Sequence, residues 1–158
     1  SGKYRLNYAQ CNANDTCRKA ISTVKFRCPD SVKMYMTTDL PDDFSFRSDP
    51  KRVEQVIINY LTNAVKHTNE GEIHLHVSDK ENPGMLTFSV ADTGEGVPAD
   101  KAEFIFGRFE KLNTIKGGTG LGLAICRNIA GQLGGEAKLD TTYGPKGARF
   151  IFTHPVEK

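Results

Sequence analysis

Two amides and an ammonium group lie on one side of a predicted helix. Asn59, Asn63 and Lys66 are four and three residues apart, so on a helix they project within roughly 60° of arc. Such a row can position and neutralise a charged ligand, but a solvated helix face has the same composition. By itself the row does not decide between a binding site and an exposed surface.

A second candidate is the acid that ends an apolar segment. Asp92 opens the stretch Asp-Thr-Gly-Glu-Gly-Val, in which Gly94 and Gly96 let the backbone turn sharply and approach a ligand. A buried carboxylate here can accept a hydrogen bond from an exocyclic amine such as adenine N6, which distinguishes adenine from guanine. The alternative is an ordinary glycine turn at the end of a strand.

A glycine-rich segment runs directly into a predicted helix. Residues 117–125 read Gly-Gly-Thr-Gly-Leu-Gly-Leu-Ala-Ile, and the unpaired N–H groups of a helix N-terminus suit a polyphosphate. The segment is not a Walker loop, because the Gly-Lys-Ser/Thr ending is missing and the glycine spacing does not fit Gly-x-Gly-x-x-Gly. Glycines that permit close helix packing are the alternative.

Cationic side chains lie between the two glycine motifs. Arg108 stands between Phe106 and Phe109, and Lys111 and Lys116 follow it. The two phenylalanines, three residues apart, could simply anchor a helix in the core. The cations could instead bring hydrogen-bond donors to a loop that closes over phosphates.

The helix that must position the amide row is predicted over residues 50–68. Ser48 and Asp49 supply an N-cap candidate, and Pro50 falls at the first helical position, where its missing N–H does no harm. The apolar residues of this helix recur at spacings of three, four, seven and eight and form one stripe that faces the core: Val53, Val56, Ile57, Tyr60, Leu61, Ala64 and Val65.

The remaining elements predict a sheet covered by helices. We expect 32–37 and 44–47 to pair as a hairpin, and 72–78 and 86–90 to form an antiparallel pair with one buried face. Strands in such a series, interrupted by helices, favour an α+β two-layer sandwich over a doubly wound parallel sheet. The other expected strands are 4–9, 136–141 and 148–153, and the other expected helices run from 12 or 15 to 24, from 99 to 109 and from 120 to 133.

Length and composition are those of one soluble domain. The 158 residues contain no run of 18 apolar residues, and we expect residues 1–3 to be a cloning remnant or linker and 4–158 to form a single domain. A net charge of +2 from scattered basic residues gives no sign of a nucleic-acid partner. Four cysteines without zinc-site spacing favour a reducing, cytoplasmic compartment. His74 and His76 lack a third ligand, so a solvated strand face is favoured over a metal site.

Four stretches, in this order and spacing, resemble the catalytic and ATP-binding domain of bacterial sensor histidine kinases in the GHKL superfamily. Residues 59–66 look like its N box, 92–96 its G1 box, 106–109 its F box and 118–123 its G2 box. The resemblance covers nearly the whole chain, although Ala148 replaces a serine often found in the closing hairpin. It implies a Bergerat-type fold, a mixed and mostly antiparallel sheet with three main helices on one face and a short ATP lid.

The resemblance also implies roles for individual residues. Asn63 should coordinate Mg²⁺ between the phosphates with Asn59 assisting, Lys66 should contact phosphate, Asp92 should bind adenine N6, and Arg108 should reach the γ-phosphate. His67 departs from the phenylalanine or tyrosine usual at its position, which makes base stacking weaker or pH-sensitive. The other residues expected around the nucleotide are Gly94, Gly96, Val97, Phe109, Gly118, Thr119, Gly120, Leu121 and Gly122.

The same superfamily contains true ATPases, which place a glutamate at the Asn59 position as general base for water. An amide cannot abstract a proton at neutral pH, so transfer to a protein acceptor is favoured over hydrolysis. An anti-sigma-type serine kinase and a regulatory nucleotide-binding module without transfer remain as alternatives.

The phosphate acceptor is expected on another part of the parent kinase. No acceptor motif such as His-Glu-x-x-x-Pro surrounds His67, His74, His76 or His154. The expected partners are therefore the parent's dimerisation and histidine-phosphotransfer helical hairpin and, downstream, the receiver domain of a response regulator. Alone, the chain is expected to be monomeric, to bind Mg-ATP and to autophosphorylate negligibly, and the parent is expected to be a membrane-anchored sensor with this domain in the cytoplasm.

Overall fold

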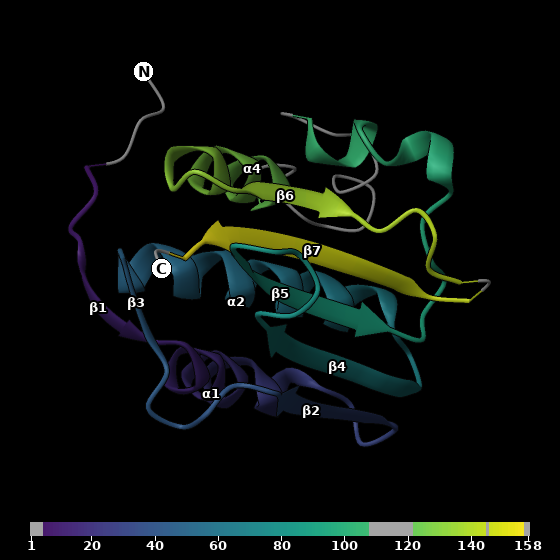
Figure 1. Ribbon diagram of the computed structural model, residues 1–158. Coiled ribbons are helices and arrows are strands. Elements are labelled where there is room, and N and C mark those ends of the chain that lie inside the picture. Colours follow the sequence, from purple (N-terminus) through teal and green to yellow (C-terminus); the bar gives the residue numbers. More distant parts are fainter. Residues whose placement is uncertain (1–4, 108–121, 145, 157–158) are drawn as a thin grey trace.

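Five strands form one sheet and two shorter strands form a separate ribbon (Figure 1). The computed structural model describes residues 5–107, 122–144 and 146–156. The sheet strands are β2 (Val32–Thr38), β4 (Gly71–Ser78), β5 (Met85–Asp92), β6 (Glu136–Leu139) and β7 (Ala148–Pro155), and the ribbon pairs β1 (Ala9–Asn12) with β3 (Ser45–Ser48). The sheet order is β2-β4-β5-β7-β6, with β2 parallel to β4 and the other three pairs antiparallel.

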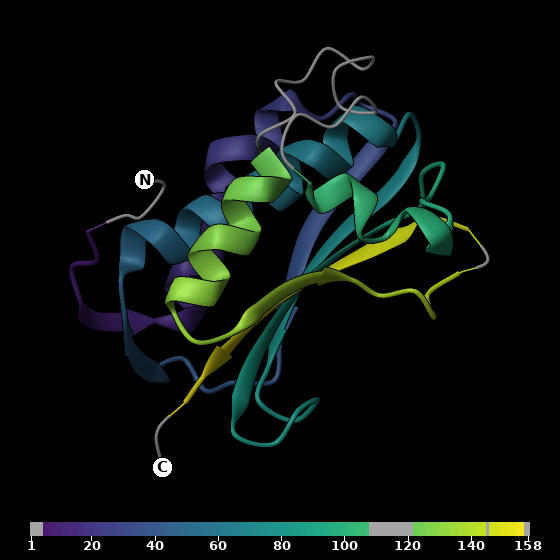
Figure 2. The ribbon, with the colours of Figure 1, turned by 90° about the horizontal axis from the view of Figure 1, so that it is seen from above.

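Three α-helices of the described chain cover one face of this sheet (Figure 2). They are α1 (Ala13–Val24), α2 (Pro50–His67) and α4 (Gly122–Gln132). The short 3₁₀ helix η1 (Lys25–Arg27) lies directly after α1, and the short 3₁₀ helices η2 (Ala99–Lys101) and η3 (Phe104–Phe106) lie between β5 and α4. Helix α1 packs on β2 and β4, α2 on β4 and β5, and α4 on β6 and β7. The predicted α+β two-layer sandwich with a mixed, mostly antiparallel sheet is therefore confirmed. None of the helices in the described ranges is long and apolar enough to cross a membrane.

Strand alternation decides which face the helices cover. In β4, the side chains of Ile73, Leu75 and Val77 are fully buried, while His74 and His76 lie on the opposite face and are half-buried. Leu86, Phe88 and Val90 repeat the pattern in β5. Burying apolar side chains on one face only leaves the other face polar, as the sequence predicted.

Helix α2 is the central helix of its layer and packs between α1 and α4. The Asp49 side chain caps it by accepting a 3.2 Å hydrogen bond from the Arg52 backbone N–H, and Pro50 occupies the first turn. Six of the seven stripe residues are buried, and Val65 is partly buried against the same core. The helix is therefore fixed by its apolar stripe, which leaves Asn59, Asn63 and Lys66 off to one side of the stripe.

The predicted hairpin between 32–37 and 44–47 is wrong. Strand β2 pairs in parallel with β4, and β3 pairs with β1 in the ribbon. Parallel neighbours require a crossover connection, and the crossover from β2 to β4 runs through β3 and α2. Residues 39–43 therefore do not form a hairpin turn but connect the end of β2 to the ribbon strand β3.

Among the other predicted elements, the first strand, the helix expected over 99–109 and the strand expected over 136–141 also differ from the structure. The first strand begins at Ala9, not at residue 4, because its partner β3 is only four residues long. The helix expected over 99–109 is, within the described residues, the two 3₁₀ turns η2 and η3, since the segment buries few side chains and cannot sustain an α-helical stripe. The strand expected to end at 141 stops at Leu139, where its pairing with β7 ends.

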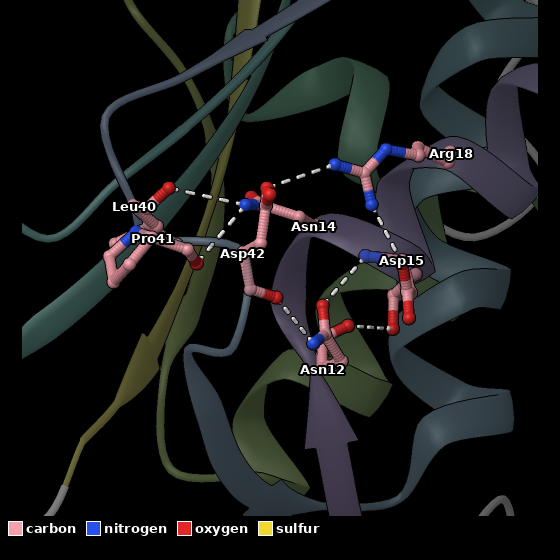
Figure 3. Close-up of polar contacts among 8 residues, drawn as sticks. Asn12, Asn14, Asp15, Arg18, Leu40, Pro41 and Asp42 are labelled. Carbon is pink, nitrogen blue, oxygen red and sulfur yellow. Dashed lines mark hydrogen bonds and ion pairs between the residues drawn. The ribbon is translucent and has the colours of Figure 1, made fainter.

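A polar network holds the start of α1 against the connection between β2 and β3 (Figure 3). The Asn12 side chain caps α1 through the Asp15 N–H at 2.9 Å and also donates to the Asp42 carbonyl oxygen at 2.7 Å. The buried Asn14 amide donates to the carbonyl oxygens of Leu40 and Pro41 at 3.2 and 3.3 Å. These bonds replace the hairpin contacts that the sequence predicted for this connection.

Candidate functional site

A cavity of about 150 Å³ opens where the C-terminal part of α2 meets the end of β5. Five residues predicted from the sequence line it, namely Asn63, His67, Asp92, Gly96 and Val97. The other lining residues are Glu95, Pro98, Ile105, Leu123, Ala148 and Phe150. The structure thus brings Asn63 of the expected N box and Asp92 and Gly96 of the expected G1 box together around one space whose remaining lining is largely apolar.

Asp92 is the buried acceptor of this cavity. It is the last residue of β5, it is 3% exposed, and its Oδ1 accepts a 2.9 Å hydrogen bond from the Gly94 backbone N–H. Burial raises the pKa of the carboxyl group, while backbone hydrogen bonds from Gly94 and Ala148 and the nearby His67 charge act in the opposite direction. A carboxylate held by two backbone N–H groups keeps acceptor capacity for a ligand donor.

Gly94 is required where the loop after β5 crosses the end of α2. A Cβ at this position would lie 2.1 Å from the backbone carbonyl oxygen of His67, a distance that no real side chain tolerates. Gly96 has a φ of +80°, which favours glycine, and a Cβ there would lie 2.8 Å from the Gly147 carbonyl oxygen. Both glycines let three backbone segments approach one another at the cavity wall.

The three residues of the polar row on α2 lie in different positions relative to the cavity. Asn63 lines the cavity. Asn59, one turn earlier, donates a 3.3 Å hydrogen bond from Nδ2 to the carbonyl oxygen of Gly122, the first residue of α4. Lys66 is exposed in the last turn of the helix. Asn59 and Lys66 therefore flank the cavity without lining it.

Comparison with known proteins places this arrangement in a family. The model of the family described as histidine kinase-, DNA gyrase B- and HSP90-like ATPase matches residues 48–158. The chain belongs to this family.

Its relatives in the family include much longer sensory kinases. The adaptive-response sensory kinase SasA of Thermosynechococcus vestitus is 34% identical over 158 residues, which are 98% of this chain and 41% of SasA. The circadian input-output histidine kinase CikA of Synechococcus elongatus is 39% identical over 117 residues, 71% of this chain and 15% of CikA. The chain spans less than half the length of either relative.

Solved structures show which part of such kinases the chain matches. Full-length ShkA in complex with AMPPNP has a TM-score of 0.84 at 30% identity and covers 98% of this chain, which corresponds to 32% of ShkA. The catalytic domain of the histidine kinase ThkA has a TM-score of 0.77 at 28% identity, with 95% of this chain and 98% of ThkA's covered. As a member of the histidine kinase-, DNA gyrase B- and HSP90-like ATPase family, this chain is an ATP-binding catalytic domain of the sensor histidine kinase type.

Several predicted site residues lie outside the part of the chain that the structure describes. They are Arg108, Phe109, Gly118, Thr119, Gly120 and Leu121. Gly122, the last member of that group of predictions, is described as the first residue of α4, and its carbonyl oxygen accepts the Asn59 hydrogen bond.

Apart from Val97, sequence reasoning missed the apolar part of the cavity. Ile105, Leu123 and Phe150 are 5%, 5% and 2% exposed and belong to the same buried cluster as the rest of the core. In a sequence such residues cannot be told from ordinary core residues. Glu95 and Pro98 carried a usable signal, because they lie within or directly after the G1 motif.

Proposed function

We propose that this domain binds Mg-ATP and transfers the γ-phosphate to a histidine on a separate helical hairpin of its parent sensor kinase. The observation that carries the proposal is the position of Asp92, a buried carboxylate inside a mostly apolar cavity that Asn63 also lines. Family membership and the AMPPNP complex of the relative ShkA support ATP as the ligand.

The cavity suits an adenine base. Val97, Ile105 and Phe150 offer apolar contacts to a flat ring. The Asp92 carboxylate accepts a hydrogen bond from the exocyclic N6 amine, a donor that guanine lacks at the corresponding position. Adenine selection therefore rests on one buried acceptor, and the loss of that acceptor leaves the base with apolar contacts alone.

The phosphates extend from the base toward the polar row of α2. Mg²⁺ binds through one or two protein oxygens together with phosphate oxygens and water, and the Asn63 side chain supplies one such oxygen. Lys66, exposed near the cavity, is assigned to phosphate. We assign Arg108 to the γ-phosphate and the segment from Gly118 to Gly122 to the lid, where backbone N–H groups bind the polyphosphate.

Transfer to a protein is favoured over hydrolysis because of Asn59. Its amide cannot deprotonate water, and its Nδ2 is engaged with the Gly122 carbonyl oxygen at 3.3 Å. The domain then contributes positioning and charge neutralisation, which account for most of the catalysis of phosphoryl transfer. The phosphohistidine would pass its phosphate to a response-regulator receiver domain in the cytoplasm, where ATP is available.

Two measurements test the proposal. Calorimetric titration with a non-hydrolysable ATP analogue should show saturable one-site binding that is tighter with Mg²⁺ than with chelator. Addition of the parent's acceptor hairpin in trans should then give labelled hairpin from γ-labelled ATP, whereas the domain alone stays unlabelled. Binding without transfer to the hairpin would favour the regulatory module, rapid phosphate release would favour an ATPase, and absent binding would contradict the proposal entirely.

A further inference from the structure

His67 and Glu95 form a pair at the edge of the cavity. His67 is the last residue of α2 and Glu95 lies in the loop after β5, yet His67 Nδ1 is 2.8 Å from Glu95 Oε2 and both residues line the cavity. Their side chains are 23% and 53% exposed. A pair this exposed contributes little to the free energy of unfolding, so its main effect is on geometry.

The backbone holds the two partners at this separation. The Glu95 backbone N–H donates to the His67 carbonyl oxygen at 3.4 Å. The absence of a side chain at Gly94 allows the same carbonyl oxygen to lie against the loop. The pair is therefore built into the crossing of the loop over α2 and does not depend on long side chains meeting by chance.

The contact defines the state of the imidazole ring. A carboxylate oxygen only accepts, so the His67 Nδ1 carries the proton that it donates to Glu95. A ring held at one nitrogen loses its freedom to rotate about the Cβ–Cγ bond. Where His67 lines the cavity, it thus presents a flat surface with a fixed orientation.

We infer that Glu95 is a positioning residue, which holds the His67 imidazole in the orientation that contacts the base of the bound nucleotide. This inference rests on the proposed function. A preoriented aromatic surface loses less conformational freedom when a ligand binds, and the gain appears as affinity. Glu95 acts in this way through His67.

A purely electrostatic role and a positioning role of Glu95 predict opposite changes in nucleotide affinity when its carboxylate is removed. If Glu95 acted only as a negative charge near a polyphosphate, Glu95→Ala would tighten nucleotide binding. If it positions His67, the same substitution weakens binding although it removes a repulsive charge. In a His67→Phe background, which keeps the surface aromatic but offers Glu95 no hydrogen-bond donor, the positioning effect disappears.

The experiment is a double-mutant cycle on the dissociation constant of an ATP analogue with Mg²⁺, measured by calorimetry. Glu95→Ala, which removes both the charge and the acceptor, should weaken binding by about threefold to tenfold in the wild-type background, the equivalent of one hydrogen bond. In the His67→Phe background its effect should fall below about twofold, the scatter expected between independent sites. Glu70→Ala, at an exposed neighbouring position on the loop after α2, is the matched control for the loss of one negatively charged side chain.

The possible outcomes distinguish a failure of this inference from a failure of the proposed function on which it rests. Tighter binding by Glu95→Ala, or equal weakening in both backgrounds, overturns the positioning role while the proposed function stands. A wild-type domain that shows no saturable binding overturns the proposed function and this inference together. Melting temperatures of the four proteins of the cycle and of the control show whether a lower affinity reflects loss of fold, and a Glu95→Ala effect explained entirely by unfolding also overturns the role.

Discussion

Tyr60 on α2 donates a 2.7 Å hydrogen bond to the backbone carbonyl oxygen of Ile151 on β7. The Tyr60 ring is 1% exposed and lies 5.4 Å from the ring of Phe150, which lines the cavity. The contact therefore joins the helix that carries Asn63 to the strand that supplies the apolar side of the site. Because α2 and β7 contribute both to the hydrophobic core and to the cavity, a change that loosens their packing also changes the geometry of the site.

Tyr60→Phe should lower the free energy of unfolding by about 1–2 kcal/mol, because it removes a buried donor and keeps the ring packing. Chemical denaturation monitored by circular dichroism measures the change. Tyr35→Phe is the matched control, since the Tyr35 hydroxyl bonds an exposed Glu72 carboxylate at 3.2 Å, and it should change stability by less than about 0.5 kcal/mol. Equal effects of the two substitutions would contradict the role of the buried bond.

Asp92→Asn should weaken ATP binding by roughly tenfold to a hundredfold, because an amide group near adenine N6 offers a donor where the base needs an acceptor. The discrimination between ATP and GTP should fall with it. Competitive titration of both nucleotides measures the two constants. Asp100→Asn, which makes the same change at an exposed position of η2, is the control, and a loss of affinity in Asp100→Asn as large as in Asp92→Asn would argue against adenine recognition by Asp92.

Asn63→Ala should remove most of the gain in affinity that Mg²⁺ gives, since the cation loses a protein oxygen ligand. Binding of the metal-free nucleotide should stay within about twofold of wild type. The measurement is the ratio of dissociation constants with and without Mg²⁺, compared with Asn69→Ala at an exposed position just after α2. An unchanged ratio in Asn63→Ala would remove Asn63 from the cation site.

The elements that the sequence predicted correctly are those whose signal is local. Helix α2 runs over Pro50–His67 against an expected 50–68, because a cap, a proline and an apolar stripe all lie within the segment. The pairing of β2 with β4 was missed because its seven paired positions join two segments that lie almost forty residues apart in the sequence. No local pattern in either strand specifies its neighbour.

The residues of the site also divide into those with a local sequence signal, which were predicted, and those without one, which were missed. Asn63, Asp92 and Gly96 were found because motifs name them, and they converge in one cavity. Phe150 and Ile105 were missed because a buried apolar residue has the same sequence pattern whether it faces core or ligand. The contact between His67 and Glu95 could not be predicted, since it depends on how the loop after β5 crosses α2.

Stability should fall as the pH falls below about 6.5 because of His154. Its Nδ1 lies 2.8 Å from the Pro155 carbonyl oxygen and its Nε2 lies 2.7 Å from Ser48 Oγ, so Nδ1 carries the proton and Nε2 accepts from the hydroxyl. Burial lowers the pKa of His154 from its ordinary value of 6.5. Between the lowered pKa and 6.5 the unfolded chain binds more protons than the folded one, and stability is lost as pH decreases through this window.

Melting temperatures between about pH 7 and pH 5 measure this dependence across the range where histidine titrates. His154→Gln should reduce the slope of melting temperature against pH. His74, whose pKa burial also lowers, contributes in the same direction, so a residual slope should disappear on addition of His74→Gln. A His154→Gln protein with the full wild-type slope would contradict the assignment.

Gly94→Ala and Gly131→Ala form a matched pair, which compares a glycine at a close backbone contact with a glycine at an open helical position. A Cβ at position 94 would lie 2.1 Å from the His67 backbone carbonyl oxygen, while a Cβ at position 131 in α4 meets nothing within 4 Å. Gly94→Ala should therefore displace the loop from α2, destabilise the domain by about 2–4 kcal/mol and weaken ATP binding. Gly131→Ala should stabilise it by up to about 1 kcal/mol through helix propensity and leave ATP binding unchanged. Denaturation curves and nucleotide titrations on both variants measure the contrast, and a Gly94→Ala protein with wild-type stability and affinity would show that the loop need not contact the end of α2.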